Sequence, residues 1–215
     1  MAKIPFGILG PVIGTIGPVI GKRWKGKATV SSRREAAKTD KNPTPKQANQ
    51  RTKFGFVSNF LSGLGPLVKV SFVEQAVGKT EFQCAVGYNV SNAVSGEYPD
   101  YTLHYDRVSV GRGTLPNAVL PEAKPGDNPG EIRFVWADNT GMGTAQAGDG
   151  AMAVTFIPGG RRGWGFYPAP QVRRSDCSLI YSMQDYRGPV HTWLLFVSES
   201  GKASDSVYTG EVMVG

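Results

Sequence analysis

YTLHYDRVSV, residues 101–110, is the stretch of the sequence at which the spacing of apolar residues changes. Before it, apolar residues recur at helical spacing, whereas within it Tyr101, Leu103 and Tyr105 alternate with polar residues. Strict alternation is typical of a β-strand with one buried face. We therefore expect helices before residue 99 and strands after it, in a chain of the α+β class.

Six further stretches after this point have strand character, and turn-forming sequences such as KPGDNPG, DNTGMG and PGGRRG separate them. They are Ile132–Ala137, Ala151–Ile157, Gly165–Tyr167, Cys177–Met183, Val190–Val197 and Ser206–Val214. Short strands with regular turns predict an immunoglobulin- or fibronectin type III-like β-sandwich over residues 99–215. Trp136 and Trp193 lie on two of these strands, where aromatic side chains pack into a core.

Residues 44–98 are predicted to hold two helices. TPKQ, residues 44–47, offers a threonine N-cap, a proline at the first helical position and a glutamine that completes a capping box. TEFQ, residues 80–83, is a second capping box formed by Thr80 and Gln83. The two apolar stripes that follow are Phe54, Val57, Leu61 and Leu64, then Phe82, Val86, Val90 and Ala93. PLVKVSFV, between them, is compatible with a helix or a strand.

Residues 1–43 are predicted to form an extended arm and linker, because GPVIG occurs twice between residues 10 and 21 and its glycines and prolines prevent a regular helix. Apolar side chains on a single extended segment have no core of their own, so we expect them to be buried against another molecule. The expected assembly residues are Val12, Ile13, Ile16, Val19, Ile20 and Trp24.

Charge divides the chain unevenly. The net charge is +7, but residues 1–53 carry 12 basic and 2 acidic residues, and the remainder carries 12 and 15. A cationic front on a mildly acidic body is typical of an arm that contacts an acidic protein or nucleic acid, although a merely solvated tail has the same composition. The basic residues expected to make such contacts are Lys22, Arg23, Lys25, Lys27, Arg33 and Arg34.

The apolar leader resembles neither a signal peptide nor a membrane span. Pro5, Pro11 and Pro18 interrupt it, and the basic cluster follows in place of a small-residue cleavage site. The sequence therefore predicts no transmembrane segment and synthesis in the cytoplasm. Delivery to a virion, or to the cell surface without a signal peptide, stays open.

Residues suited to catalysis are few. His104 and His191 are the two histidines, and the motifs of nucleophilic hydrolases and zinc enzymes are missing from the sequence. Cys84 and Cys177 form neither a disulfide framework nor a zinc motif, and Cys84 fits a small core residue. We expect a protein that is not an enzyme and has neither a cofactor nor a metal site.

One loop, PGGRRGWGFYPAPQVRR at residues 158–174, combines arginines with aromatic residues. Arginine binds phosphate and aromatic rings stack on bases or sugars, so the loop is the best ligand-contact candidate of the sandwich. A plain hairpin with solvated arginines fits the pattern better. The residues concerned are Arg161, Arg162, Trp164, Phe166 and Tyr167.

Six segments distributed over nearly the whole chain carry a resemblance. They are GPVIGKRWKGKATVSS, TPKQANQRTKF, VGYNVSNAVSGEYPDY, RGTLPNAV, FVWADNTG and VYTGEV. In this order they resemble an uncharacterised family from Bacteroidota, the domain of unknown function 6266. The basic strand and the glutamine–arginine–phenylalanine pattern after it are also similar, more weakly, to phage-associated structural proteins. The resemblance implies a class and a source but no activity, and this chain departs from the family in Pro11 and Pro18.

Three functions are compatible with these observations. The first, which we favour, is a structural subunit that self-assembles through its N-terminal arm into a homo-oligomer or larger object such as a filament, a surface layer or a virion component. The second is a nucleic-acid-associated protein whose basic arm contacts phosphates. The third is a monomeric Ig-like module that binds a ligand or glycan.

Overall fold

The computed structural model describes residues 10–24, 26–33, 43–159, 163–166, 171–184 and 186–215. The chain divides into two compact units. We call residues 1–44 the N-terminal unit and residues 45–215 the body, and describe each by itself.

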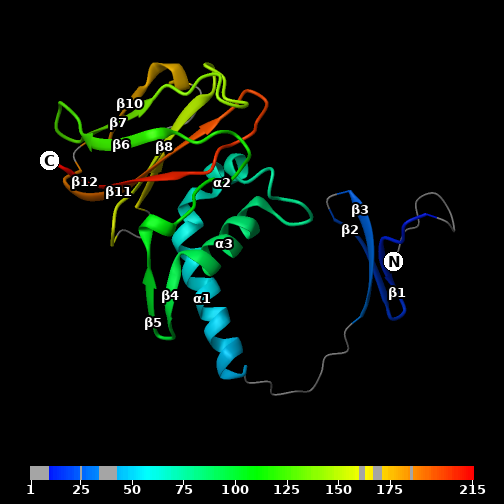
Figure 1. Cartoon of the computed structure of the whole chain (residues 1–215). Helices are drawn as coiled ribbons and strands as arrows, with labels where there is room; N and C mark the ends of the chain where they lie inside the picture. The colour runs from blue at the N-terminus through cyan, green and yellow to red at the C-terminus, as the bar shows by residue number, and fades with distance from the viewer. Residues whose placement is uncertain (1–9, 25, 34–42, 160–162, 167–170, 185) are drawn as a thin grey trace. The chain divides into compact units, whose positions relative to one another are not determined.

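The N-terminal unit holds a three-stranded antiparallel sheet (Figure 1). Its strands are β1 (Gly14–Ile16), β2 (Val19–Trp24) and β3 (Lys27–Ser32), in the order β1-β2-β3. The expectation of a single extended arm was wrong for these residues. Gly17, the first residue of the second GPVIG repeat, has a φ of 56° and reverses the chain between β1 and β2, and the strands then satisfy each other's backbone groups.

The body begins with three helices instead of the two expected. They are α1 (Pro45–Leu61), α2 (Gly65–Ser71) and α3 (Glu81–Asn92), with a 3₁₀ turn at Ser62–Leu64. The ambiguous stretch PLVKVSFV forms most of α2, which has a proline in its first turn. The capping box of α3 is present, because Gln83 donates its N–H to the Thr80 hydroxyl at 3.2 Å and accepts from the Thr80 N–H at 3.0 Å.

Two antiparallel sheets follow the helices. The first has the order β10-β7-β6 and the second β12-β11-β8-β9. Their strands are β6 (Val119–Pro125), β7 (Glu131–Ala137), β8 (Gly150–Phe156), β9 (Trp164–Phe166), β10 (Ser178–Ser182), β11 (Gly188–Val197) and β12 (Val207–Val214). A separate hairpin joins β4 (Val94–Glu97) to β5 (Asp100–Leu103). The body is therefore a mixed α+β structure.

The prediction of a strand over residues 101–110 was wrong in its second half. β5 ends at Leu103, a 3₁₀ turn occupies Tyr105–Arg107, and β5 pairs with β4 outside the two larger sheets. The prediction lacked two strands of the body, β4 and β6. β6 contains two prolines and a shifted register. Proline is tolerated there because β6 lies at the edge of its sheet, where an N–H is not needed.

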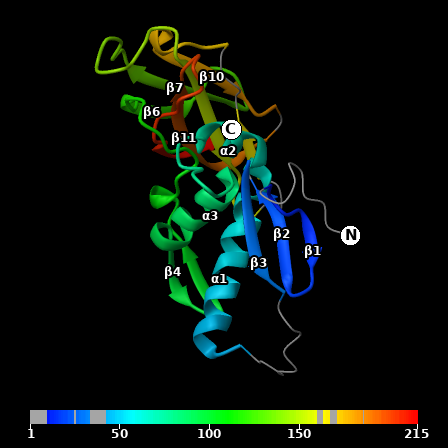
Figure 2. The same ribbon diagram turned by 90° about the vertical axis from the view of Figure 1, so that its right-hand side faces the viewer.

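The second sheet lies between the helices and the first sheet, so β8 is buried along its whole length. Met152, Val154 and Phe156 face the helices, whereas Ala151 and Ala153 face the first sheet, as strand alternation requires. In both views the helices and the β6–β7–β10 sheet lie at opposite ends of the body (Figures 1 and 2). The body thus has two cores on either side of one sheet.

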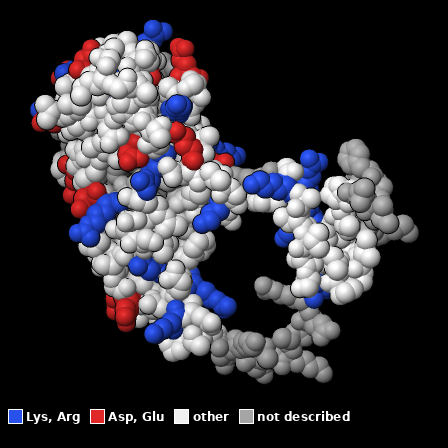
Figure 3. All heavy atoms as spheres, turned by 45° about the vertical axis from the view of Figure 1, so that its right-hand side comes forward, with Lys and Arg blue, Asp and Glu red and all other residues white. Residues whose placement is uncertain are grey.

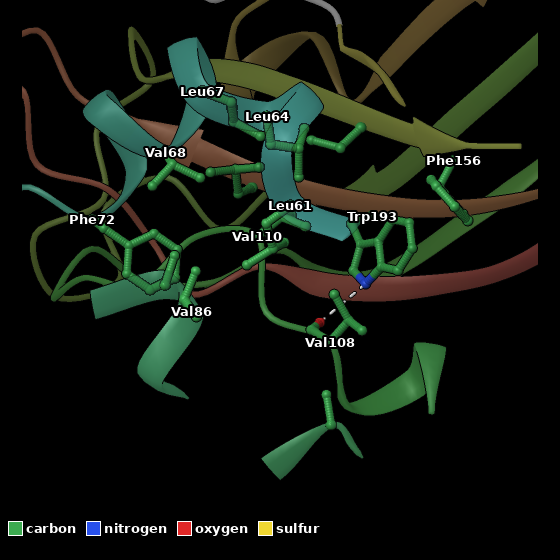
Figure 4. Packing of buried hydrophobic residues seen from close by; sticks show 14 of the residues in the cluster. Leu61, Leu64, Leu67, Val68, Phe72, Val86, Val108, Val110, Phe156 and Trp193 are labelled. Atoms are coloured by element: carbon green, nitrogen blue, oxygen red, sulfur yellow. Dashed lines mark hydrogen bonds between the residues drawn. The ribbon is translucent and has the colours of Figure 1, made fainter. Parts of the chain in front are cut away.

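The core between the helices and the second sheet contains Leu61, Leu64, Phe72 and Trp193 (Figure 4). The indole N–H of Trp193 donates to the Val108 carbonyl at 3.1 Å, which satisfies the one polar atom of that buried ring. Trp136 packs in the other core, so both tryptophans are buried as expected.

Phe54 is a correction to the predicted stripe of α1, because 47% of its surface is exposed. α1 contacts the β4–β5 hairpin through Asn49 and Phe56. Two residues correspond to about 200° around a helix, so Phe54 points away from the side that carries Phe56.

Candidate functional site

Strand pairing gives the N-terminal sheet two chemically different faces. Ile16 pairs with Val19, and Gly14, Gly21 and Val30 form one row across the three strands. Paired residues point to the same side and successive residues to opposite sides. The side that we call the apolar face comprises Gly14, Ile16, Val19, Gly21, Arg23, Ala28, Val30 and Ser32.

The opposite side, which we call the cationic face, comprises Thr15, Ile20, Lys22, Trp24, Lys27, Thr29 and Ser31. Trp24 lies directly opposite Lys27, and Lys22 lies opposite Thr29. The expected assembly residues therefore do not form one surface. Ile16 and Val19 belong to the apolar face, Ile20 and Trp24 to the cationic face, and Val12 and Ile13 precede β1.

Both faces expose large apolar side chains. The exposed fractions are 46% for Ile16 and 66% for Val30 on the apolar face, and 51% for Trp24 on the cationic face. Among the described residues of this unit, Gly21 is the only buried one. A β-sheet needs a hydrophobic face packed against other residues to be stable, and the described residues of this unit supply no core for the sheet.

Gly21 is buried because the chain ahead of β1 lies against it. A Cβ atom at this position would collide with the carbonyl oxygen of Val12. Residues 11 and 12 are half-buried, while Ile16 and Val30 stay exposed on the same side of the sheet. The glycine of the second GPVIG repeat thus allows a close backbone approach.

The predicted basic contact residues are divided between the two faces. Lys22 and Lys27 are exposed on the cationic face, whereas Arg23 lies on the apolar face and its Nε donates to the Gly26 carbonyl at 3.2 Å. Arg33 directly follows β3 and is exposed. Lys25 and Arg34 lie outside the described residues. No acidic residue occurs between residues 10 and 33, and Figure 3 shows only Lys and Arg colouring on this unit.

The predicted ligand loop places its tryptophan against the core of the body, where it is half-buried. The Trp164 N–H donates to the Phe60 carbonyl at 2.6 Å, and its ring centroid lies 4.6 Å from that of Phe156. Phe166 is half-buried beside the same core. Arg161, Arg162 and Tyr167 lie outside the described residues. Trp164 is thus partly buried against the core, and it also lines a pocket of about 350 Å³ beside Tyr181 and Tyr186.

Two adjoining grooves of the body share Tyr88 and Arg112. Their volumes are about 390 and 290 Å³. The Arg112 guanidinium lies 4.3 Å from the Tyr88 ring centroid and 3.8 Å from an Asp205 carboxylate oxygen. Because its charge is already matched by Asp205, Arg112 has little left with which to attract an anionic ligand.

His191 lies in an aromatic cluster. Its ring stacks on Tyr105 with centroids 3.7 Å apart, and its Nδ1 lies 2.8 Å from the Tyr208 hydroxyl. Burial lowers the pKa of His191, while the nearby Glu211 carboxylate works in the opposite direction. Burial, followed by Glu211, raises the pKa of both Tyr105 and Tyr208. The cluster therefore holds a neutral histidine between two protonated tyrosines at neutral pH.

His104, the other histidine, lies 2.7 Å from the Ser95 hydroxyl through its Nε2. The thiol of Cys84 donates to the Gln75 carbonyl at 3.2 Å beside the helical core. Within the described ranges, no group of three or more His, Cys, Asp and Glu side chains could hold a metal ion. Across the same ranges, every helix is too short or too polar to cross a membrane.

With the fold and these surfaces described, the chain can be assigned to a family. It belongs to the family of unknown function DUF6266, whose model matches residues 11–210. The match covers strands of the N-terminal sheet as well as the helices and sheets of the body, so the sheet is part of the family's domain. No curated protein matches the chain.

Proposed function

We propose that the protein is a non-enzymatic structural subunit that assembles through its N-terminal unit. The observation that carries the proposal is a three-stranded sheet whose described residues form no core and on which Ile16 and Val30 are exposed. Burying an aliphatic side chain contributes about 1.5–3 kcal/mol. The apolar face therefore gains free energy by packing against a partner.

The partner in this proposal is a second copy of the chain. Residues 1–44 carry nine basic and two acidic residues, whereas residues 45–215 carry 15 of each. Two N-terminal sheets packed together would bring the whole positive charge of both copies into one place. Packing the sheet of one copy on the body of the next avoids that repulsion.

Charge also indicates which part of the body receives the sheet of another copy. Residues 41–73, which include α1 and α2, contain no acidic residue and would repel the sheet. Residues 74–215 carry 11 basic and 15 acidic residues, so the receiving surface lies within this part of the body. Such a head-to-tail contact joins two different surfaces, and it builds a ring if the rotation closes and a filament if it does not.

The arrangement of the body supports an assembly module of the immunoglobulin or fibronectin type III kind. The seven strands β6 to β12 correspond in chain order to the strands A to G of such a domain. β6, β7 and β10, in the positions of A, B and E, share one sheet. β8, β9, β11 and β12, in the positions of C, D, F and G, share the other. This is the division by which strands B and E pair in one sheet and strands C, F and G in the other. An origin in Bacteroidota and a place in a virion, a filament or a surface layer stay predictions.

The test is the mass in solution of variants on the two faces, measured by light scattering after size-exclusion chromatography. Ile16→Ser/Val30→Ser should lower the association constant by roughly tenfold or more, because two exposed aliphatic groups no longer become buried. Trp24→Ser is the matched control, since it removes a large apolar group from the opposite face, and it should leave the mass unchanged.

Two results would contradict the proposal. Assembly that survives Ile16→Ser/Val30→Ser unchanged would exclude the apolar face as the contact. An equal loss of assembly in Trp24→Ser would show that the contact does not distinguish the two faces. Circular dichroism of each variant verifies that the body remains folded.

A further inference from the structure

We propose that the cationic face of the N-terminal sheet binds single-stranded nucleic acid, with Lys22 and Lys27 on phosphates and Trp24 stacked on a base. This surface is distinct from the apolar face to which we assign assembly. The proposal begins from the pairing of β2 with β3, which places these three side chains on one side of the sheet.

The geometry matches a stacking platform bordered by cations. Trp24 and Lys22 are two residues apart on β2, a separation of about 7 Å along a strand, and Lys27 lies directly across from Trp24 on β3. All three side chains are exposed. Proteins that bind single strands combine a cationic surface with aromatic rings on which bases stack.

The charge of the unit suits an anionic partner. The unit carries nine basic and two acidic residues, and no acidic residue occurs in the stretch that contains the three strands. For comparison, the side-chain ion pairs found in the described ranges all lie in the body. The lysines of the cationic face are thus available to phosphates.

The composition of the face favours a nucleic acid over a lipid surface. A face that lies in a membrane has contiguous apolar side chains. Here Thr15, Thr29 and Ser31 share the surface with Ile20 and Trp24. The Thr29 hydroxyl donates to the Lys22 carbonyl and the Ser31 hydroxyl to the Ile20 carbonyl, so both side chains lie along the strands. An isolated indole between ammonium groups suits a base better than an acyl layer.

The test uses the full chain and a fluorescein-labelled single-stranded oligonucleotide, with anisotropy followed over a series of salt concentrations. Each phosphate contact contributes about 0.7 to the slope of log K against log salt for single strands. Lys22→Gln/Lys27→Gln should therefore lower the slope by about 1.4. Lys22→Arg/Lys27→Arg keeps the charges and should restore binding.

Stacking has its own readout. Of the four tryptophans, which all lie in the described ranges, only Trp24 is exposed. Iodide, which quenches exposed tryptophans, identifies the fluorescence of Trp24. Oligonucleotide binding should quench this part of the fluorescence. Trp24→Ala should remove that quenching and weaken binding roughly tenfold, because base stacking on an aromatic ring is worth about 1–3 kcal/mol.

The control for assembly is Ile16→Ser/Val30→Ser, which leaves the cationic face intact. With the slope expressed per protein chain, this variant should keep the salt dependence of the native protein. A loss of assembly can therefore be distinguished from a loss of oligonucleotide binding. Two results would overturn the proposal. The first is no binding to the oligonucleotide, whether or not phosphatidylserine vesicles are bound, and the second is binding with an unchanged slope in Lys22→Gln/Lys27→Gln.

Discussion

Arg174 is the buried residue on which the loops beside the first sheet converge. Its side chain donates to Asp149 at 3.0 Å, to Asn139 at 2.6 Å and to the Pro116 carbonyl at 3.0 Å, and it lies over the Phe196 ring. Burial lowers the pKa of its guanidinium, and the Asp149 carboxylate opposes that shift. The sequence gives no hint of this role, because the partners come from segments that only the fold brings together.

Arg174→Met should lower the free energy of unfolding by about 3–5 kcal/mol, because it leaves the buried Asp149 carboxylate without its partner. Adding Asp149→Leu should recover a large part of that loss. Urea denaturation gives both values. Arg173→Met is the matched control, since Arg173 is exposed, and it should change stability by less than about 0.5 kcal/mol. Similar losses from both arginines would contradict this account.

His191 makes the stability depend on pH. Because burial lowers its pKa in the folded state, the unfolded chain binds more protons below about pH 6.5, and the free energy of unfolding falls as the pH drops. In urea denaturation at several pH values, His191→Gln should reduce this fall. A fall of the same size in His191→Gln would contradict the assignment of the pH dependence to His191.

At the scale of elements, the sequence was most informative where a local interaction decides the structure. The Thr80–Gln83 capping box is read from four residues, and alternation located β7, β8, β10 and β11 to within two residues at each end. β6 was missed because its prolines and exposed side chains hide the strand pattern. Phe54 was misplaced because helical spacing alone cannot tell which side of α1 meets the body.

Thr80→Ala should lower the free energy of unfolding by about 1 kcal/mol, because the Gln83 N–H loses its capping acceptor. Chemical denaturation followed by circular dichroism measures the change. Ser91→Ala, in the last turn of the same helix, keeps the cap and should differ from the native protein by less than about 0.5 kcal/mol. An unchanged stability in Thr80→Ala would mean that tertiary packing alone fixes the start of α3.

The candidate site shows the same division between local and non-local information. The sequence located the apolar and basic residues of the N-terminal unit, but it could not assign them to faces, since that depends on the pairing of β2 with β1 and β3. Val30 was therefore not among the expected contact residues, and Trp24 was grouped with the wrong neighbours. Composition likewise suggested a ligand role for Trp164, but it could not show that this ring packs against the core and hydrogen-bonds the Phe60 carbonyl.

At the scale of the whole molecule, the uneven charge and the exposed sheet are features of the same unit, and assembly through that unit explains both. The N-terminal unit, whose described residues form no core, carries the net positive charge, and the larger body, whose charge is balanced, contains both cores. The family match extends over both. A chain built in this way fits a subunit that uses one unit for contacts and the other for stability.

The most direct test of this account is the mass of the unmodified full-length chain in sedimentation equilibrium over a range of protein concentrations. The account predicts a mass that rises with concentration above the 23.1 kDa of a single chain, with the rise absent in Ile16→Ser/Val30→Ser. A mass of 23.1 kDa at every concentration would contradict it.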